Sequence, residues 1–425
     1  MKRVVILCVW LFSVVAGHAQ LSLDECRRLA RENYPEIRQY DLVHQTEQYN
    51  LSNAARAWIP QLAFSAQATW QTDAPNFPKE LTGMLAQQGL EIPGLRKDQY
   101  KVALELNQTI WDGGKSVADK RIARAEAAEQ KTMTDVDLYE LEGRVDDLYF
   151  GILLLDERIA QTNLTLNLLR SNLEKVRALQ RNGVAMQSDA DVLEAELLSV
   201  GQQLIQFESS CDSYRRMLGI FIGQRVGDRK LQRPSAVQPL SGESARPELA
   251  MFAAKIDRLT AQEKMVKSSM PRLGFFAQGY YGYPGLDYMQ GMMNSDWSWN
   301  AMLGVKLSWN FGAYYTQKNN LNKLRTSRQQ VEVQRDVFLF NMNLQAAQEN
   351  GDIARLRKAI ADDDRIVALR RSVREAAESK LRNGIIDTHD LLSKITDEST
   401  ASMARSMREI ELLKAIYEYK HTINR

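Results

Sequence analysis

The segment 297–311 alternates between apolar residues and polar or small ones. Its odd-numbered positions carry Trp, Ala, Leu, Val and Phe, whereas its even-numbered positions carry mainly Ser, Asn, Lys and Gly. Successive side chains of a β-strand point to opposite faces, so the segment is predicted to form a long strand with one apolar and one polar face. The segments 61–72 and 100–111 alternate in the same way, and 272–284 is rich in aromatic residues.

All four predicted strands are long enough to cross a membrane, which takes about 9–11 tilted residues. Tryptophans lie near their ends, as in the aromatic belts of membrane strands: Trp70, Trp111, Trp297, Trp299 and Trp309. On the pattern alone, a soluble β-sandwich that buries the apolar faces in its core stays open as an alternative.

Most of the remaining chain has the apolar spacing of long helices. Between 115 and 181 there is no proline, and apolar residues follow at alternate intervals of four and three: Leu141, Val145, Leu148, Ile152, Leu155 and Ile159. The same rhythm returns after a turn at 182–188, with Leu193, Leu197, Val200 and Leu204. Two such stripes joined by a short turn predict an antiparallel coiled-coil hairpin over 115–218. Cys211 falls on the stripe and is expected to be a small buried side chain.

Several short motifs occur twice, in the same order. Pro35-Glu36-Ile37 returns as Pro247-Glu248-Leu249, and Arg181-Asn182-Gly183-Val184 returns as Arg382-Asn383-Gly384-Ile385. This order predicts a tandem duplication, with a first repeat at 20–222, a linker at 223–245 that is rich in Pro, Gly and Ser, and a second repeat at 246–425. The second hairpin is expected over 315–425. Its run Asp362-Asp363-Asp364 interrupts the apolar stripe and is expected to lie on a solvated face.

The first 19 residues have the pattern of a secretory signal peptide. A short basic start is followed by an apolar stretch, and small residues precede a predicted cut between Ala19 and Gln20. No other stretch is long and apolar enough for a transmembrane helix, so any membrane span would consist of strands.

Charge and composition exclude several function classes. The chain has 55 basic and 53 acidic residues, a net charge of +2, which gives no reason to expect a nucleic-acid partner. After signal cleavage only Cys26 and Cys211 remain, so no disulfide framework is expected. The remaining histidines, His44, His389 and His421, lie far apart, and no catalytic or metal motif is present. Neither an enzyme nor a cofactor is therefore expected.

Four strands per chain cannot close a barrel, and open strand edges are not tolerated in lipid. Several chains would therefore share one barrel. Two chains would give eight strands and a filled interior, whereas three would give twelve strands, wide enough for a channel.

The sequence resembles the TolC-type outer-membrane efflux protein family over nearly all of the mature chain. The residues that carry the resemblance are Gln108–Gly114 (QTIWDGG) with their echo Leu307–Gly312 (LSWNFG), the turns 182–189 and 383–392, and the Pro-Glu start of each repeat. The resemblance implies a homotrimer of mainly α fold. Duplicated coiled-coil hairpins would form a periplasmic tunnel, and four membrane strands per chain would form a twelve-stranded barrel.

The resemblance also implies a function and partners. The protein would be the outer-membrane exit duct of a tripartite efflux or type I secretion system. It would receive solutes from an inner-membrane pump through a periplasmic adapter that docks on the tunnel tip, around the turn glycines Gly183 and Gly384. A periplasmic coiled-coil adapter, or a structural scaffold without a channel, is the alternative.

For the gate at the tunnel tip, the resemblance implies an acidic ring at Asp390. A second acidic position of the family is Ser393 here, for which Asp387 could compensate. Ser188 and Asp189 match a polar pair in the first turn, whereas the usual tyrosine and arginine partners correspond to Leu381 and Ile386. The salt-linked lock of the family is thus incomplete, and we hypothesise that apolar contacts of Ile385 or Ile386 close the gate.

The same turn residues also have plain structural roles. Gly183 and Gly384 are expected to supply a positive φ where a helix ends. Ser188 and Thr388 are expected to be the N-caps of the returning helices, with Asp189 and Asp390 in their first turns. Asp390 could be a helix-start residue only, or one that also serves the gate.

Overall fold

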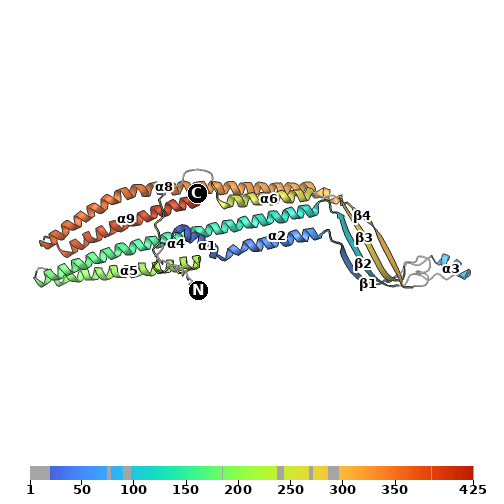
Figure 1. Ribbon diagram of the computed structural model, residues 1–425, viewed down its shortest axis with the longest axis horizontal. Helices are drawn as coiled ribbons and strands as arrows, with labels where there is room; N and C mark the ends of the chain where they lie inside the picture. Colours follow the sequence, from blue (N-terminus) through green and yellow to red (C-terminus); the bar gives the residue numbers. More distant parts are fainter. Residues whose placement is uncertain are drawn as a thin grey trace, which may run out of the picture. The chain divides into compact units, whose positions relative to one another are not determined.

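The computed structural model describes residues 20–73, 78–89, 97–183, 185–236, 244–267, 271–285, 296–383 and 385–424. The predicted signal segment up to Ala19, and Gly384, lie outside these ranges. The helices are α1 (Leu23–Asn33), η1 (Pro35–Arg38), α2 (Gln39–Arg56), α3 (Lys79–Gln87), α4 (Lys115–Arg181), α5 (Gln187–Ile222), α6 (Pro247–Lys267), α8 (Gly312–Arg382) and α9 (Thr388–Ile423) (Figure 1). The strands are β1 (Gln61–Trp70), β2 (Asp98–Trp111), β3 (Arg272–Tyr283) and β4 (Ser298–Ser308).

The chain divides into two compact units, and each takes residues from both predicted repeats. The hairpin unit comprises residues up to Tyr40, 132–251 and 334–425, and the sheet unit comprises 41–131 and 252–333. The long helices α4 and α8 contribute to both. The expected fold class, long paired helices with four strands, is confirmed.

The four strands form one antiparallel sheet in the order β1-β2-β3-β4. Phe64 of β1 is opposite Leu104 of β2, Leu104 is opposite Gly279 of β3, and Gly279 is opposite Ala301 of β4. This register places most of the large apolar residues of the four strands on one face, because strand side chains alternate. The sheet ends at β1 on one side and at β4 on the other, so both edges are open within the chain.

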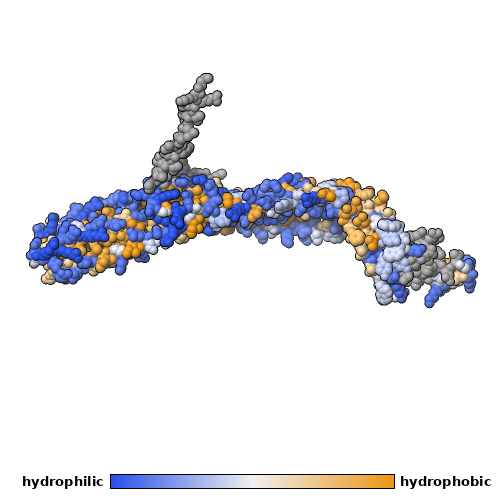
Figure 2. Space-filling model, turned by 60° about the horizontal axis from the view of Figure 1, so that its bottom comes forward, coloured by the Kyte–Doolittle hydropathy of each residue, from blue (hydrophilic) through white to orange (hydrophobic). Residues whose placement is uncertain are grey.

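The apolar face of the sheet is bare. Its large side chains are mostly exposed: Phe64 (72%), Leu104 (54%), Trp299 (77%), Leu303 (75%), Val305 (64%) and Leu307 (66%). Figure 2 shows hydrophobic residues gathered over the strands. A soluble β-sandwich, the alternative that the sequence left open, would bury these side chains under a second sheet. The described strands instead form a single sheet.

The opposite face of the sheet, which we call the wet face, carries mainly polar and small residues, together with Phe276, Tyr280 and Met302. Gln278 Nε2 donates a hydrogen bond of 2.5 Å to Glu105 Oε1, and Lys101 Nζ lies 4.5 Å from the centre of the Tyr280 ring. At Gly304, a Cβ atom would lie 3.0 Å from the Phe276 ring, so glycine lets the edge of this ring approach β4 closely. The alternation seen in the sequence is thus confirmed on both faces.

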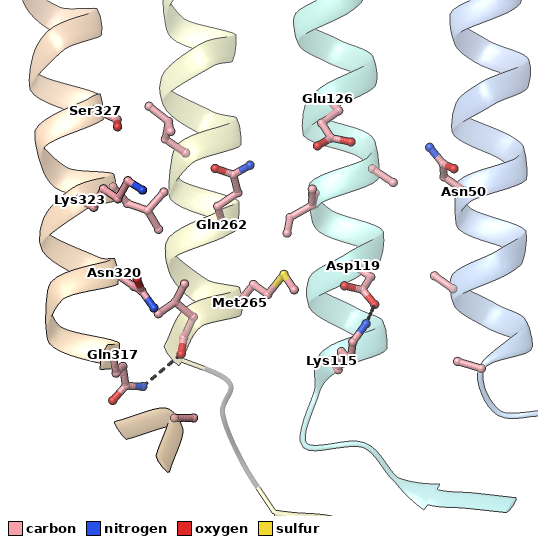
Figure 3. Close-up of a pocket in the computed structure, with 18 of the residues that line it drawn as sticks. Asn50, Lys115, Asp119, Glu126, Gln262, Met265, Gln317, Asn320, Lys323 and Ser327 are labelled. Carbon is pink, nitrogen blue, oxygen red and sulfur yellow. Dashed lines mark hydrogen bonds and ion pairs between the residues drawn. The ribbon is translucent and has the colours of Figure 1, made fainter. Parts of the chain in front are cut away.

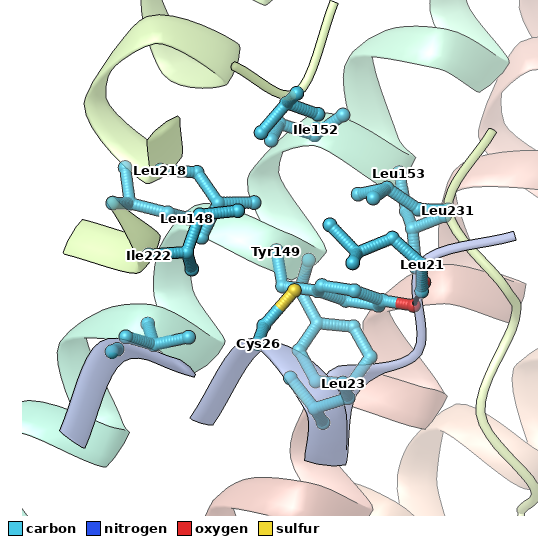
Figure 4. Close-up of a cluster of buried hydrophobic side chains, with 14 of the residues drawn as sticks. Leu21, Leu23, Cys26, Leu148, Tyr149, Ile152, Leu153, Leu218, Ile222 and Leu231 are labelled. Atoms are coloured by element: carbon cyan, nitrogen blue, oxygen red, sulfur yellow. Dashed lines mark hydrogen bonds between the residues drawn. The ribbon is translucent and has the colours of Figure 1, made fainter. Parts of the chain in front are cut away.

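A core in the hairpin unit joins α1, α4 and α5 to the segment that follows α5. Cys26, Tyr149, Leu218 and Leu231 are among its buried members (Figure 4). The Tyr149 hydroxyl lies 2.8 Å from the Leu21 carbonyl oxygen and 2.5 Å from that of Gln232. Burial also raises the pKa of the Cys26 thiol to about 12, so this cysteine stays protonated. The N-terminal segment is therefore fixed against the segment that leaves α5.

The apolar stripes of α4 and α5 pack together as predicted. Leu148, Ile152 and Leu218 are buried, and Cys211 is 5% exposed on the same stripe. Gly151 allows the two helices to approach closely, since a Cβ there would lie 2.6 Å from the Tyr214 ring.

The expectation for the Asp362-Asp363-Asp364 run is wrong for Asp363, which is buried and paired with Arg408 of α9. Asp364 is exposed, as expected for a solvated face, and its carboxylate pairs with Arg405 at 2.9 Å.

No helix within the described ranges is long and apolar enough to cross a membrane.

Candidate functional site

The first predicted site element is the turn between α4 and α5. Gly183 has φ +76°, which confirms the expected left-handed conformation, and its N–H donates to the Gln180 carbonyl oxygen at 2.9 Å. Ser188 is not the N-cap, because α5 begins one residue earlier, at Gln187. Instead, the Asp189 carboxylate accepts a hydrogen bond of 2.8 Å from the Met186 N–H, and so satisfies the backbone at the helix start.

The second turn joins α8 to α9 and is capped by a different residue from the one expected. Thr388 is the first residue of α9 and is buried, so it is not the N-cap. Asp387 takes that position, and its Oδ1 accepts a hydrogen bond of 2.8 Å from the Asp390 N–H. The Asp390 side chain itself is exposed and has no hydrogen bond or ion pair within the described residues. Asp387 is thus held by the backbone, whereas the Asp390 carboxylate is available.

An apolar cluster in the helices next to the two turns packs the hairpins against each other. It unites buried residues from all four long helices: Leu166, Leu169, Leu173, Val176, Ala190, Leu193, Val200, Ala377, Leu391 and Ile395. Ile386 is half-buried against this cluster, whereas Ile385 is 68% exposed. Of the two isoleucines hypothesised to close a gate, Ile386 therefore belongs to the packing of its own chain, and Ile385 is free to contact another surface.

Ion pairs and hydrogen bonds also link the hairpins. Lys175 of α4 lies 3.4 Å from Glu378 of α8, and Arg374 binds Glu378 at 2.6 Å. Although burial opposes the ionised form, Arg374 and Lys175 lower the pKa of Glu378. Nearer the middle of the helices, the Thr165 and Ser399 hydroxyls lie 2.6 Å apart. These contacts join α4 to the second hairpin at several levels.

The sheet unit contains a second candidate site that sequence analysis did not identify. A cavity of 1230 Å³ is lined by side chains of α2, α4, α6 and α8 and by Arg272 (Figure 3). A smaller cavity of 450 Å³ adjoins it at the wet face of the sheet and shares Lys115, Asp119 and Arg272 with it. The sequence signal for this site was the polar half of the strand alternation, which included Lys306.

The three histidines do not come together. His421 is stacked on Tyr139, with ring centres 4.2 Å apart, His44 lies beside Gln48, and His389 is exposed in the first turn of α9. Within the described residues, no group of three or more His, Cys, Asp or Glu side chains is placed to hold a metal ion.

The chain is similar to known proteins in both sequence and fold. Residues 27–223 match the family described as outer membrane efflux protein. A comparison with curated proteins finds no match. Among solved structures, the outer-membrane channel OprN has a TM-score of 0.70 at 14% identity, over 94% of this chain and 89% of that chain.

Two further solved structures share the fold. The outer membrane protein VceC from Vibrio cholerae has a TM-score of 0.68 at 14% identity, over 94% of this chain and 95% of that chain. The CmeC outer membrane channel of Campylobacter jejuni has a TM-score of 0.65 at 14% identity, over 94% of this chain and 85% of that chain.

Proposed function

We propose that this chain, of which residues 27–223 match the outer membrane efflux protein family, is the exit duct of a tripartite export system. The sheet lies in the outer membrane, and the paired helices extend into the periplasm. Solutes enter from an inner-membrane pump through a periplasmic adapter. The family match supports this channel and not the alternative of an adapter or a channel-free scaffold.

The observation that carries the proposal is the bare apolar face of the sheet. Leaving one large apolar side chain in water costs about 1.5–3 kcal/mol relative to burying it. Five such exposed side chains, Phe64, Leu104, Leu303, Val305 and Leu307, would together cost about as much as the whole stability of a typical domain. Lipid removes this cost, because it covers the apolar face while the wet face lines a pore.

The open edges of the sheet support a trimer. An unpaired strand edge is not tolerated in lipid, so β4 of one chain would pair with β1 of the next. Three copies of a four-stranded sheet give twelve strands, enough to enclose a channel. The trimer also places three copies of each helical turn around one axis.

At the turns, we propose that Asp390 forms the charged ring of a gate. Its carboxylate is exposed and unpaired within the described residues, whereas Asp387, Asp189 and Ile386 are engaged in their own chain. Ile385, which is exposed, would make the apolar contact between copies. Ser188 and the glycines Gly183 and Gly384 would border the surface on which the adapter docks.

Two neighbouring positions on β4 test the membrane placement of the sheet. Leu303 is on the apolar face and Met302 is on the wet face, and both are exposed. A lysine that faces the middle of a bilayer costs about 2–4 kcal/mol, whereas a lysine that faces water costs little. Leu303→Lys is expected to reduce the amount of protein in the outer-membrane fraction severalfold, and Met302→Lys to leave it close to that of the wild type. Equal loss or equal retention of the two variants would contradict the placement.

A further inference from the structure

The wet face of the sheet has an excess of basic side chains. Lys101, Arg272 and Lys306 lie on this face, and Glu105 is the acidic residue among them. Glu105 already accepts a hydrogen bond from Gln278. Arg272 and Lys306 lie on neighbouring strands, β3 and β4, two positions apart in register, because Arg272 pairs with Ser308 and Gly274 pairs with Lys306. Their charges therefore add at the end of the sheet that adjoins the helices.

The larger of the two cavities at this end of the sheet is also lined by a third basic side chain, that of Lys323. Arg272 lines both cavities, Lys306 lines the smaller one and Lys323 of α8 lines the larger one. Within the described residues, no ion pair or side-chain hydrogen bond engages the charged groups of Arg272, Lys306 or Lys323. We call these three residues the basic zone.

The acidic residues that line the cavities compensate only part of this charge. Asp119 is paired with Lys115 at 2.5 Å. Asp112 Oδ1 accepts from the Gly114 N–H at 2.9 Å and its Oδ2 from the Ser116 N–H at 2.7 Å, so this carboxylate serves the start of α4. Glu126 is the remaining acidic residue of the lining. The three cations of the basic zone thus face one carboxylate that is not already engaged.

The start of α8 adds to the positive potential. Both α4 and α8 begin at this end of the sheet, but Asp112 offsets the start of α4, whereas α8 has no acidic residue in its first turn. The N-terminal end of a helix carries a partial positive charge, which acidic residues of the first turn commonly offset.

We propose that the basic zone binds polyvalent anions and makes the duct favour anionic solutes. This inference rests on the proposed channel function, since the wet face must line the pore. The smaller cavity, at 450 Å³, has the size of a small-molecule site. In a trimer the zone would occur three times around the pore, and a low-dielectric wall with charges of one sign concentrates counter-ions.

Block of the channel current by inorganic pyrophosphate tests this inference. Purified protein is inserted into a planar bilayer in about 0.1 M KCl, where charges interact over about 10 Å. Pyrophosphate is added on both sides of the bilayer, so that it reaches the basic zone from either entrance of the channel. The half-blocking concentration is then compared with that of the triple variant Arg272→Gln, Lys306→Gln, Lys323→Gln.

A matched control triple variant separates local from general charge. Arg121, Lys264 and Lys318 are exposed basic residues of the same unit that line neither cavity. Their replacement by Gln removes the same charge. We expect the half-blocking concentration to rise about tenfold in the zone variant, as the loss of several nearby charges implies, and to change less than about twofold in the control. If the zone variant forms no channels, the single variants Lys306→Gln and Lys323→Gln are expected to show part of the rise.

The outcomes separate this inference from the function on which it rests. Wild-type channels that pyrophosphate does not block, or equal block in the wild type and the zone variants, would overturn the anion site and leave the channel intact. An equal rise in the control would assign the effect to overall charge and also overturn the site. No conductance from the wild type would contradict the channel function itself, and the anion site with it.

Discussion

At the scale of single residues, the helical turns depend on a few positions that only certain residue types can fill. Gly183 adopts φ +76°, a conformation in which other residues are strained. Asp387 and Asp189 use their carboxylates to satisfy backbone N–H groups at the starts of α9 and α5. These side chains determine where the helices end and begin, and so where the exposed Asp390 is placed.

Gly183→Ala tests this conformational requirement. A methyl group added at Gly183, or at Gly201 in the interior of α5, would have no atom within 4 Å, so neither substitution meets a steric clash. Alanine at 183 is expected to destabilise the hairpin by about 1–2 kcal/mol, because of the left-handed backbone. Alanine at 201 is expected to stabilise it by up to about 1 kcal/mol, because alanine favours a helix over glycine. Urea unfolding followed by circular dichroism measures both, and effects of the same sign would contradict the assignment.

His421 makes the stability of the hairpin unit sensitive to acid. Burial, together with the nearby Arg246 and Arg27, lowers the pKa of His421 from 6.5 to about 4. Because the folded-state pKa lies below the unfolded one, the neutral ring contributes stability that is complete above about pH 6.5 and is lost as the pH falls toward 4. The partly exposed ring limits the effect to about 2 kcal/mol.

His421→Phe is the control for this prediction, since phenylalanine keeps the stacking on Tyr139 and cannot be protonated. We expect the wild type to lose more unfolding free energy than the variant between about pH 7 and about pH 4.5. Parallel pH profiles of the two proteins in urea unfolding would show that His421 does not carry the acid sensitivity.

Residue-level expectations succeeded where one local rule dominates. The positive φ of Gly183 and the burial of Cys211 follow from chain geometry and from the apolar stripe alone. Ser188 and Thr388 were assigned as caps wrongly, because a shift of one residue in the helix start moves the cap to another side chain. The prediction that Asp363 is exposed was wrong because its partner Arg408 belongs to another helix, and local sequence does not reveal such a partner.

At the scale of elements, periodicity predicted most of what the structure contains. The strands alternate strongly because each face meets a different environment, and the hairpins repeat their apolar stripe since one side of each helix packs on the other. The basic zone escaped prediction for a physical reason. It depends on which strands are neighbours, which places Arg272 beside Lys306, and on which acids are already engaged, as Asp119 is by Lys115.

The links between the hairpins are likewise visible only in the folded chain. Lys175 and Glu378 are far apart in the sequence and meet because the apolar cluster packs α4 against α8. Lys175 is exposed and Glu378 is half-buried, and a pair that solvent still screens on one side is worth about 1 kcal/mol. The apolar cluster, and not the ion pair, therefore holds the two turns together.

At the scale of the whole molecule, the proposed function depends on assembly. One chain supplies a sheet with an exposed apolar face and two unpaired edges. A sheet with these two features is not stable in water or in lipid as a single chain. In the proposed trimer, strand pairing between chains would satisfy the edges and outer-membrane lipid would cover the apolar face. The trimer would also bring three copies of the basic zone and of Asp390 around one pore.

Electron microscopy of detergent-extracted particles from the outer-membrane fraction tests the trimeric duct. We expect threefold particles with a helical part about 100 Å long, the length that the 67 residues of α4 span as a helix. Monomeric particles, or absence of the protein from that fraction, would contradict the trimeric duct.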